Sequence, residues 1–218
     1  MKTVAVLASG RGSNLAALIE AAAEGAPFRI GCVLANRADA PALEKARAAG
    51  IETITIESAA FGQDRAAFEL AMDGALQARG VEVVALAGFM RVLTPTFVAR
   101  WAGRLVNIHP SLLPLFPGLD THARALAAGV RLHGCTVHLV TTEVDGGPII
   151  AQAAVAVLPD DDAERLAARV LRAEHVLYPN ALALLCQGLE APVRGFGPPP
   201  NQPLIVSGWL GGSVPPLA

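Results

Sequence analysis

A buried strand that ends in polar residues decides the fold of this chain, at Val106-Asn107-Ile108-His109-Pro110-Ser111-Leu112-Leu113-Pro114. Pro110 cannot donate a hydrogen bond to a sheet and Pro114 interrupts the segment after it, so the strand must end near His109. Because Asn107 and His109 stand two positions apart on a strand, their side chains point to the same face. We therefore expect an amide and an imidazole together at the carboxyl end of a sheet, where open α/β sheets bind ligands.

A carboxylate follows in a later turn, Val144-Asp145-Gly146-Gly147-Pro148, which can bring Asp145 to the same place. An amide, an imidazole and a carboxylate suit acyl transfer, because they supply donors for an oxyanion and a group that orients and moves protons. Each residue alone has an ordinary structural interpretation, as a turn asparagine, a structural histidine and an aspartate in a tight turn. The order and spacing of all three favour the catalytic interpretation.

Around these stretches the chain alternates apolar runs with helical patterns. Residues 3–8 form a continuous apolar run, as expected of a strand buried on both faces, and further strands are predicted at 28–34, 51–56, 81–87 and 104–108. Helical spacing predicts helices at residues 15–24, from the cap Asp39 with Pro41 to Gly50, at 65–79 and from Thr94-Pro95 onward. This alternation predicts an α/β fold with a doubly wound, mostly parallel sheet and right-handed crossovers.

The pattern changes after residue 120. A short helix at 121–128 precedes two strands, 134–141 and 148–157, which the Asp145 turn joins and which we expect to be antiparallel. Residues Asp160 to Asp162 then cap a long helix at 163–187, which Pro179 should kink and Gly188 should end. The sequence thus predicts one domain at 1–190 and a Pro- and Gly-rich tail at 191–218, extended and partly disordered.

Composition narrows the classes of function. The 218 residues are 53% hydrophobic and 17% charged, with a net charge of −2 and no block of basic residues. A folded globular protein is predicted, and nucleic acid and membranes are disfavoured as partners. Cys32, Cys135 and Cys186 stand far apart, as expected of reduced buried thiols in a cytoplasmic protein rather than metal ligands. We expect no signal peptide and no spanning helix, because no apolar run approaches about 18 residues.

The first predicted strand leads into a second candidate site, Ser9-Gly10-Arg11-Gly12-Ser13-Asn14. A turn that follows a strand and opens a helix presents backbone N–H groups to an anion. Leu15 stands where a dinucleotide fingerprint needs its third glycine, and no Gly-Lys pair follows as in a nucleoside-triphosphate loop. The loop is therefore either a simple structural turn or a site for the monophosphate of a small acceptor.

Taken in order, several segments resemble the phosphoribosylglycinamide formyltransferase family, the folate-dependent formyltransferases of purine synthesis. The similarity runs from Val4 to about Gly188. It rests on Ser9 to Asn14, Asn36-Arg37-Ala38-Asp39-Ala40, Leu86-Ala87-Gly88-Phe89-Met90-Arg91, Asn107 to Pro114, Phe116-Pro117-Gly118, Val144 to Pro148, and Glu174-His175 with Tyr178-Pro179. The resemblance implies the Rossmann-like formyltransferase fold and 10-formyltetrahydrofolate as co-substrate, with no metal.

The resemblance also implies where the substrates bind. Gly12, Ser13 and Asn14 would hold the phosphate of phosphoribosylglycinamide, and Glu174 its sugar. The residues implied in folate binding are Met90, Arg91, Val92, Leu93, Asn107, Thr141, Thr142, Glu143, Val144 and Asp145, with Arg65 near the glutamate end. Small molecules would be its partners, in the cytoplasm, with the protein a monomer or homodimer.

Direct transfer is the mechanism that these groups imply. The glycinamide amine attacks the formyl carbon, Asn107 and a protonated His109 stabilise the oxyanion, and Asp145 assists proton transfer. No covalent intermediate is needed, because Ser111 and the cysteines have no evident base beside them. His122, His133, His138 and His175 lack metal-ligand spacing; we expect His138 to support the site and the others to be structural.

Three alternatives share part of this pattern. A folate hydrolase and a transfer-RNA formyltransferase resemble the chain through the same Asn, His and Asp set, but usually carry an extra N-terminal or C-terminal domain, which this sequence does not lead us to expect. A non-catalytic nucleotide-binding module would need none of Asn107, His109 and Asp145, and would bind without turnover. The chain also departs from the family at Asp120, where a histidine often precedes Thr121-His122, and in its Pro-rich tail.

Overall fold

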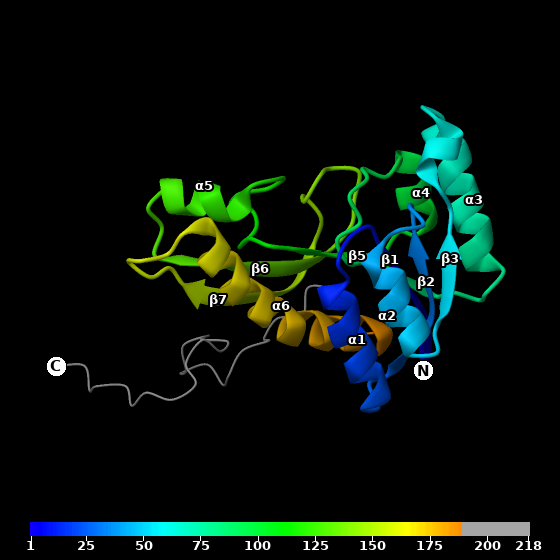
Figure 1. Cartoon of the computed structure of the whole chain (residues 1–218), viewed down its shortest axis with the longest axis horizontal. Coiled ribbons are helices and arrows are strands. Elements are labelled where there is room, and N and C mark those ends of the chain that lie inside the picture. The colour runs from blue at the N-terminus through cyan, green and yellow to red at the C-terminus, as the bar shows by residue number, and fades with distance from the viewer. Residues whose placement is uncertain (189–218) are drawn as a thin grey trace.

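The computed structural model describes residues 1–188, so the predicted tail at 191–218 lies outside the described residues. Seven strands form one sheet in the order β3-β2-β1-β4-β5-β6-β7 (Figure 1). Their bounds are β1 (Lys2–Ala8), β2 (Phe28–Ala35), β3 (Glu52–Thr55), β4 (Val83–Leu86), β5 (Leu105–His109), β6 (Leu132–Leu139) and β7 (Ile149–Ala156). The first five strands are parallel, and β6 and β7 are antiparallel. The predicted mixed, mostly parallel sheet is confirmed.

Helices cover both faces of the sheet. They are α1 (Ser13–Ala23), α2 (Pro41–Ala48), α3 (Arg65–Gln77), α4 (Pro95–Arg100), α5 (Thr121–Ala127) and α6 (Ala163–Cys186), with a 3₁₀ turn η1 (Ser58–Phe61). Val4 and Val6 of β1 pack in the cluster that includes α1, α2 and α6, whereas Ala5 and Leu7 pack against α3 and α4. Figure 1 shows these helices on opposite sides of the strands. Burial on both faces explains why β4 and most of β1 are apolar, whereas the edge strand β3 is partly exposed and more polar.

The start of α2 differs from our expectation. Asp39 does not cap this helix: its N-cap is Ala40, which makes no side-chain cap hydrogen bond, and the Asp39 carboxylate pairs with Arg37 on the surface. Pro41 explains the difference, because a residue before proline is forced into the extended conformation and so becomes the N-cap itself. The predicted cap of α6 is confirmed, since Asp162 accepts a hydrogen bond from the Arg165 amide. Pro179 lies inside α6, where its kink stays a prediction.

Tyr178 anchors α6 beneath the carboxyl ends of the central strands. Its side chain is fully buried, and its hydroxyl lies 2.9 Å from the Leu86 carbonyl oxygen of β4 and 3.3 Å from that of Val106 in β5. Burial raises the pKa of the Tyr178 phenol, which therefore stays a donor. Glu174 lies one helical turn earlier, on the same face of α6.

Removal of this hydroxyl tests the anchor. Tyr178→Phe keeps the packed ring but removes the donor, and we expect the free energy of unfolding to fall by about 1 kcal/mol, the typical net contribution of one buried hydrogen bond. Urea unfolding at pH 7 measures the change. Asn180→Ala, which alters an exposed side chain of the same helix, serves as the control and should change stability less. A Tyr178→Phe protein as stable as the control would contradict the anchoring role.

Candidate active site

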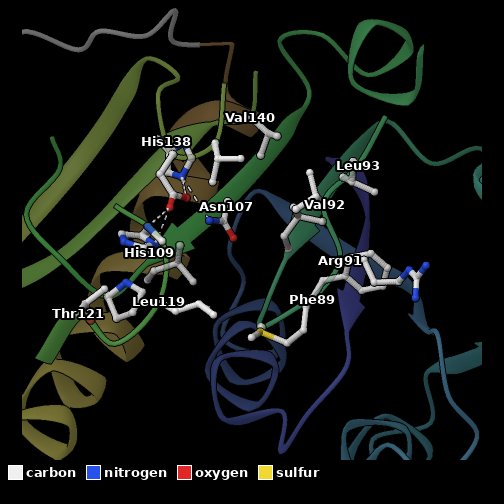
Figure 2. Close-up of a pocket in the computed structure, with 18 of the residues that line it drawn as sticks. Phe89, Arg91, Val92, Leu93, Asn107, His109, Leu119, Thr121, His138 and Val140 are labelled. Atoms are coloured by element: carbon white, nitrogen blue, oxygen red, sulfur yellow. Dashed lines mark hydrogen bonds and ion pairs between the residues drawn. The ribbon is translucent and has the colours of Figure 1, made fainter. Parts of the chain in front are cut away.

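A cavity of about 730 Å³ opens at the carboxyl ends of β4 and β5, within the size range of small-molecule sites. Figure 2 shows Asn107, His109 and His138 on one side of it, and Phe89, Arg91, Val92 and Leu93 along the other. The cavity lies where the sheet changes from parallel to antiparallel, between β5 and β6. The expected position at the carboxyl end of the sheet is thus confirmed.

Three predicted side chains meet in this cavity. Asn107 and His109 both project into it from the end of β5. Asp145 reaches them from the loop between β6 and β7, with one carboxylate oxygen 3.4 Å from His109 Nδ1 and the other 3.7 Å from His138 Nε2. The Gly118 amide donates a hydrogen bond of 2.8 Å to the carboxylate oxygen that faces His109. The carboxylate is only 11% exposed, so these neighbours replace most of its water.

The hydrogen bonds of His109 define which of its nitrogens faces the carboxylate. Nε2 lies 3.0 Å from the Phe116 carbonyl oxygen, which can only accept, so Nε2 carries a proton. Nδ1 is then the nitrogen that faces Asp145, and it becomes an N–H donor when the imidazole is protonated. A His109 cation beside the Asp145 anion would compensate the buried charge.

His138 fixes the orientation of the Asn107 amide. The two residues are directly opposite each other in the β5–β6 ladder. His138 Nδ1 lies 3.0 Å from the Leu139 carbonyl oxygen and donates to it, which leaves Nε2 to accept from Asn107 Nδ2 at 3.2 Å. Burial lowers the pKa of His138, in agreement with this neutral form. The second N–H of the Asn107 amide remains for a ligand.

A pair of histidines holds the loop that covers His109. His122 Nδ1 and His133 Nε2 lie 3.2 Å apart, and the Phe116 ring packs edge-on against His133. We expected both histidines to be structural. His133 is buried and does not line the cavity, whereas His122 does. Sequence reasoning missed His122 because no local pattern indicates that the first turn of α5 faces the cavity.

One end of the cavity contains Asn14 and Glu174. The Asn14 amide donates a hydrogen bond of 2.7 Å to the Glu174 carboxyl group, and both side chains line the cavity. Burial raises the pKa of Glu174, which this hydrogen bond partly offsets. Asn14 Oδ1 is buried with no partner within residues 1–188, so it can accept a hydrogen bond from a ligand. Ser13 lies beside them in the first turn of α1.

Gly12 precedes this turn and is required by packing as well as by conformation. It is the N-cap of α1 with φ 69°, in the left-handed region that favours glycine. A Cβ atom at this position would lie 2.9 Å from Cα and Cβ of Ala42 in α2. A larger residue would therefore displace α2, so substitution here would alter the fold of the loop and not only its access to a ligand.

The other end of the cavity has an apolar rim. Met90, Val92 and Val144 are large, more than half exposed apolar side chains, as is common where a ligand will cover them. The implied folate residues that line this end are Met90, Arg91, Val92, Leu93, Thr141, Thr142, Glu143 and Val144. Arg65 is not on the cavity wall; its guanidinium instead donates a hydrogen bond to the Val92 carbonyl oxygen.

Comparison with known proteins identifies the family of this chain. The model of the formyl transferase family matches residues 2–182. The chain therefore belongs to the formyl transferase family. It is 46% identical to phosphoribosylglycinamide formyltransferase of Escherichia coli, over 85% of this chain and 87% of that protein. The crystal structure of a phosphoribosylglycinamide formyltransferase from Brucella melitensis is 52% identical, with a TM-score of 0.82 over 87% of this chain and 97% of that one.

The same domain also occurs within longer proteins. A trifunctional purine biosynthetic protein of Drosophila pseudoobscura pseudoobscura is 50% identical over 190 residues, and this formyl transferase chain spans 14% of its length.

Within residues 1–188, no three His, Cys, Asp or Glu side chains are grouped as ligands for a metal ion. None of the helices in that range has the length and apolar character that a membrane crossing requires.

The neutral His133 predicts how stability depends on pH. Burial first, and His122 next, lower the pKa of His133 from 6.5 to about 4. As the pH falls from 7 towards 4, the unfolded chain gains a proton that the folded chain does not bind, so the free energy of unfolding decreases. In His133→Gln we expect a shallower decrease over this range, measured by urea unfolding at several pH values. Parallel pH profiles for the two proteins would contradict the assignment.

Proposed function

We propose that this formyl transferase moves the formyl group of 10-formyltetrahydrofolate to the amine of phosphoribosylglycinamide. The products are tetrahydrofolate and formylglycinamide ribonucleotide, an intermediate of purine biosynthesis. The observation that carries the proposal is the placement of Asn107, His109 and Asp145 between a helix N-terminus at one end of the cavity and an apolar rim at the other. We infer that it works in the cytoplasm as a monomer or homodimer.

The acceptor would bind at the Asn14 end. Its phosphate would lie on the N–H groups at the start of α1, at Gly12, Ser13 and Asn14, where the helix dipole favours an anion. Glu174 would accept hydrogen bonds from the ribose hydroxyls. The free Asn14 Oδ1 supports this placement, because a buried acceptor without a partner is costly until a ligand donates to it.

The folate would bind along the apolar rim. Its ring would enter between the Met90 to Leu93 segment and the turn from Thr141 to Asp145, both of which line the cavity. Two cations lie at this end. Arg91 stacks over the Phe68 ring at 5.2 Å, and Arg65 contacts the Val92 carbonyl. They would attract the carboxylates of the folate tail.

Asn107, His109 and Asp145 would carry the chemistry. The acceptor nitrogen forms a bond to the formyl carbon, the bond from that carbon to N10 breaks, and the amine proton passes to N10. The second N–H of Asn107 would donate a hydrogen bond to the oxyanion, a contribution of about 10²–10³ in rate, and the positive charge of a protonated His109 would stabilise it further. Asp145 would hold His109 and assist the proton transfer, which contributes a factor of about 10²–10⁴ in rate.

Burial raises the pKa of Cys32 to about 11, so this thiol is neutral and a poor nucleophile.

Acceptor dependence separates transfer from hydrolysis. Tetrahydrofolate and formate are measured after incubation with 10-formyltetrahydrofolate, with and without phosphoribosylglycinamide. We expect the folate to turn over only when acceptor is present, because a transferase keeps water from the formyl carbon until the amine is in line. Rapid formate release without acceptor would instead identify a hydrolase. Saturable binding without turnover under either condition would indicate a non-catalytic binding module.

Substitution of Asp145 tests the catalytic set. Asp145→Asn keeps the shape of the side chain but removes its charge and basicity, so transfer should fall by several orders of magnitude while both substrates still bind. His109→Ala should have a similar effect, and the double variant should lose little more, because the two residues act as a unit. Steady-state rates and calorimetric binding measure these effects. An Asp145→Asn protein with near-normal turnover would refute the set.

A further inference from the structure

A chain of polar side chains links the acceptor loop to the folate rim outside the catalytic set. Ser9 follows β1, Asn36 follows β2, Ser58 begins η1 after β3, and Met90 with Arg91 follows β4. These four strands are neighbours in the sheet and parallel, so their carboxyl ends bring the residues together. Asn36 opens the one segment of the family resemblance, residues 36–40, to which neither catalysis nor substrate binding assigns a role.

The hydroxyl of Ser9 connects two of these strands. Ser9 Oγ lies 2.7 Å from Asn36 Oδ1, an amide oxygen that can only accept, so the hydroxyl donates its single proton there. The oxygen of the same hydroxyl accepts the Met90 N–H at 3.1 Å. Ser9 is 8% exposed, so water competes little for either bond. Asn36 therefore fixes the direction in which the Ser9 oxygen presents its lone pairs to Met90.

The nitrogen of the Asn36 amide extends the chain to Arg91. Asn36 Nδ2 lies 3.5 Å from Ser58 Oγ, which also accepts from Arg91 Nη1 at 3.1 Å. The Ser58 amide in turn donates to the Asn36 carbonyl oxygen at 3.1 Å. One asparagine thus supports the backbone of Met90 through Ser9 and the guanidinium of Arg91 through Ser58.

The Met90 to Leu93 segment depends on such contacts because it belongs to neither a strand nor a helix. In the described part of the chain, its backbone is held by two side chains: Ser9 at the Met90 N–H and Arg65 at the Val92 carbonyl. The acceptor loop has separate supports. The Ser9 amide donates to the Gly88 carbonyl and the Ala42 amide to the Gly10 carbonyl, and neither bond uses the Ser9 hydroxyl.

We propose that Ser9 and Asn36 are positioning residues for the folate substrate. They hold the Met90 to Leu93 segment in the position where it lines the cavity. Neither residue touches the reacting atoms; Ser9 acts through the Met90 backbone, and Asn36 acts through Ser9 and Ser58. The inference rests on the proposed function for the identity of the ligand. The hydrogen-bond chain itself belongs to the ligand-free protein.

Hydrogen exchange in the ligand-free protein tests the chain without reference to activity. In Ser9→Ala and Asn36→Ala, the Met90 amide should exchange faster than in the wild type, because its acceptor is lost or turned away. In Ser58→Ala, which removes a hydroxyl from the Arg91 branch alone, exchange at Met90 should stay unchanged. Unchanged exchange at Met90 in Ser9→Ala would overturn the proposal.

Substrate kinetics test the positioning role. In Ser9→Ala the KM for 10-formyltetrahydrofolate should rise by about tenfold, comparable to the loss of one buried hydrogen bond, with a smaller change in kcat and in the KM for the acceptor. Asn36→Asp keeps an acceptor oxygen for Ser9 and should bind folate better than Asn36→Ala. Equal rises in both KM values would mean a general disruption of the two loops and would refute the positioning role.

Calorimetric titration with tetrahydrofolate separates this inference from the proposed function. If the wild type binds tetrahydrofolate and Ser9→Ala binds it equally well, the positioning role is wrong while the function stands. If the wild type does not bind it, the proposed function fails, and the folate role of Ser9 and Asn36 fails with it. Weaker binding in Ser9→Ala with binding intact in Asn36→Asp supports the proposal.

Discussion

Burial of the Asp145 carboxylate between two imidazoles costs solvation that its neighbours must offset. An ionised carboxylate away from water is tolerated when charge and hydrogen bonds compensate it. Gly118 supplies one N–H, and His138 contributes little charge because burial keeps it neutral. His109 Nδ1 lies 3.4 Å from the carboxylate, so its imidazole would balance that charge when it carries a second proton. The same positive charge would stabilise an oxyanion in the cavity, so the electrostatic requirement of the carboxylate and that of the proposed reaction coincide.

The mixed sheet makes this arrangement possible. Parallel β4 and β5 end at the same edge, which brings the Met90 segment beside Asn107. The antiparallel β6 places His138 directly opposite Asn107, and the loop that joins it to β7 returns Asp145 to that edge. Tyr178 supports the arrangement from below, through its contacts to the carbonyl oxygens of Leu86 and Val106. Asn107, His109 and His138 therefore lie on the sheet and Glu174 on a helix packed against it, whereas Asp145 and the Met90 to Leu93 segment lie in loops between such elements.

The sequence predicts those parts of the structure that depend on local pattern. Apolar runs located the strands, and the spacing of Asn107 and His109 located the cavity edge, because both follow from the two-residue period of a strand. The N-cap of α2 was misplaced by one residue, since the conformational effect of Pro41 outweighs the capping preference of Asp39. The hydrogen bonds of Ser9 join segments far apart in the chain, and no local period encodes them or the position of His122 at the cavity. Phe116, Asp120 and Asp145 have positive φ without being glycine, and all three lie in loops around the cavity, where tertiary contacts can override backbone preference.

Asp120 shows how one departure from the family pattern fits this geometry. It is the N-cap of α5 and lines the cavity, but its side chain is exposed and makes no cap hydrogen bond. An ionised carboxylate cannot donate a hydrogen bond to an oxyanion, and solvent screens its charge at an exposed position. It therefore opposes the developing negative charge only weakly. The proposed chemistry needs no donor at this position, because the Asn107 N–H, oriented by His138, and the charge of a protonated His109, oriented by Phe116, would stabilise the oxyanion.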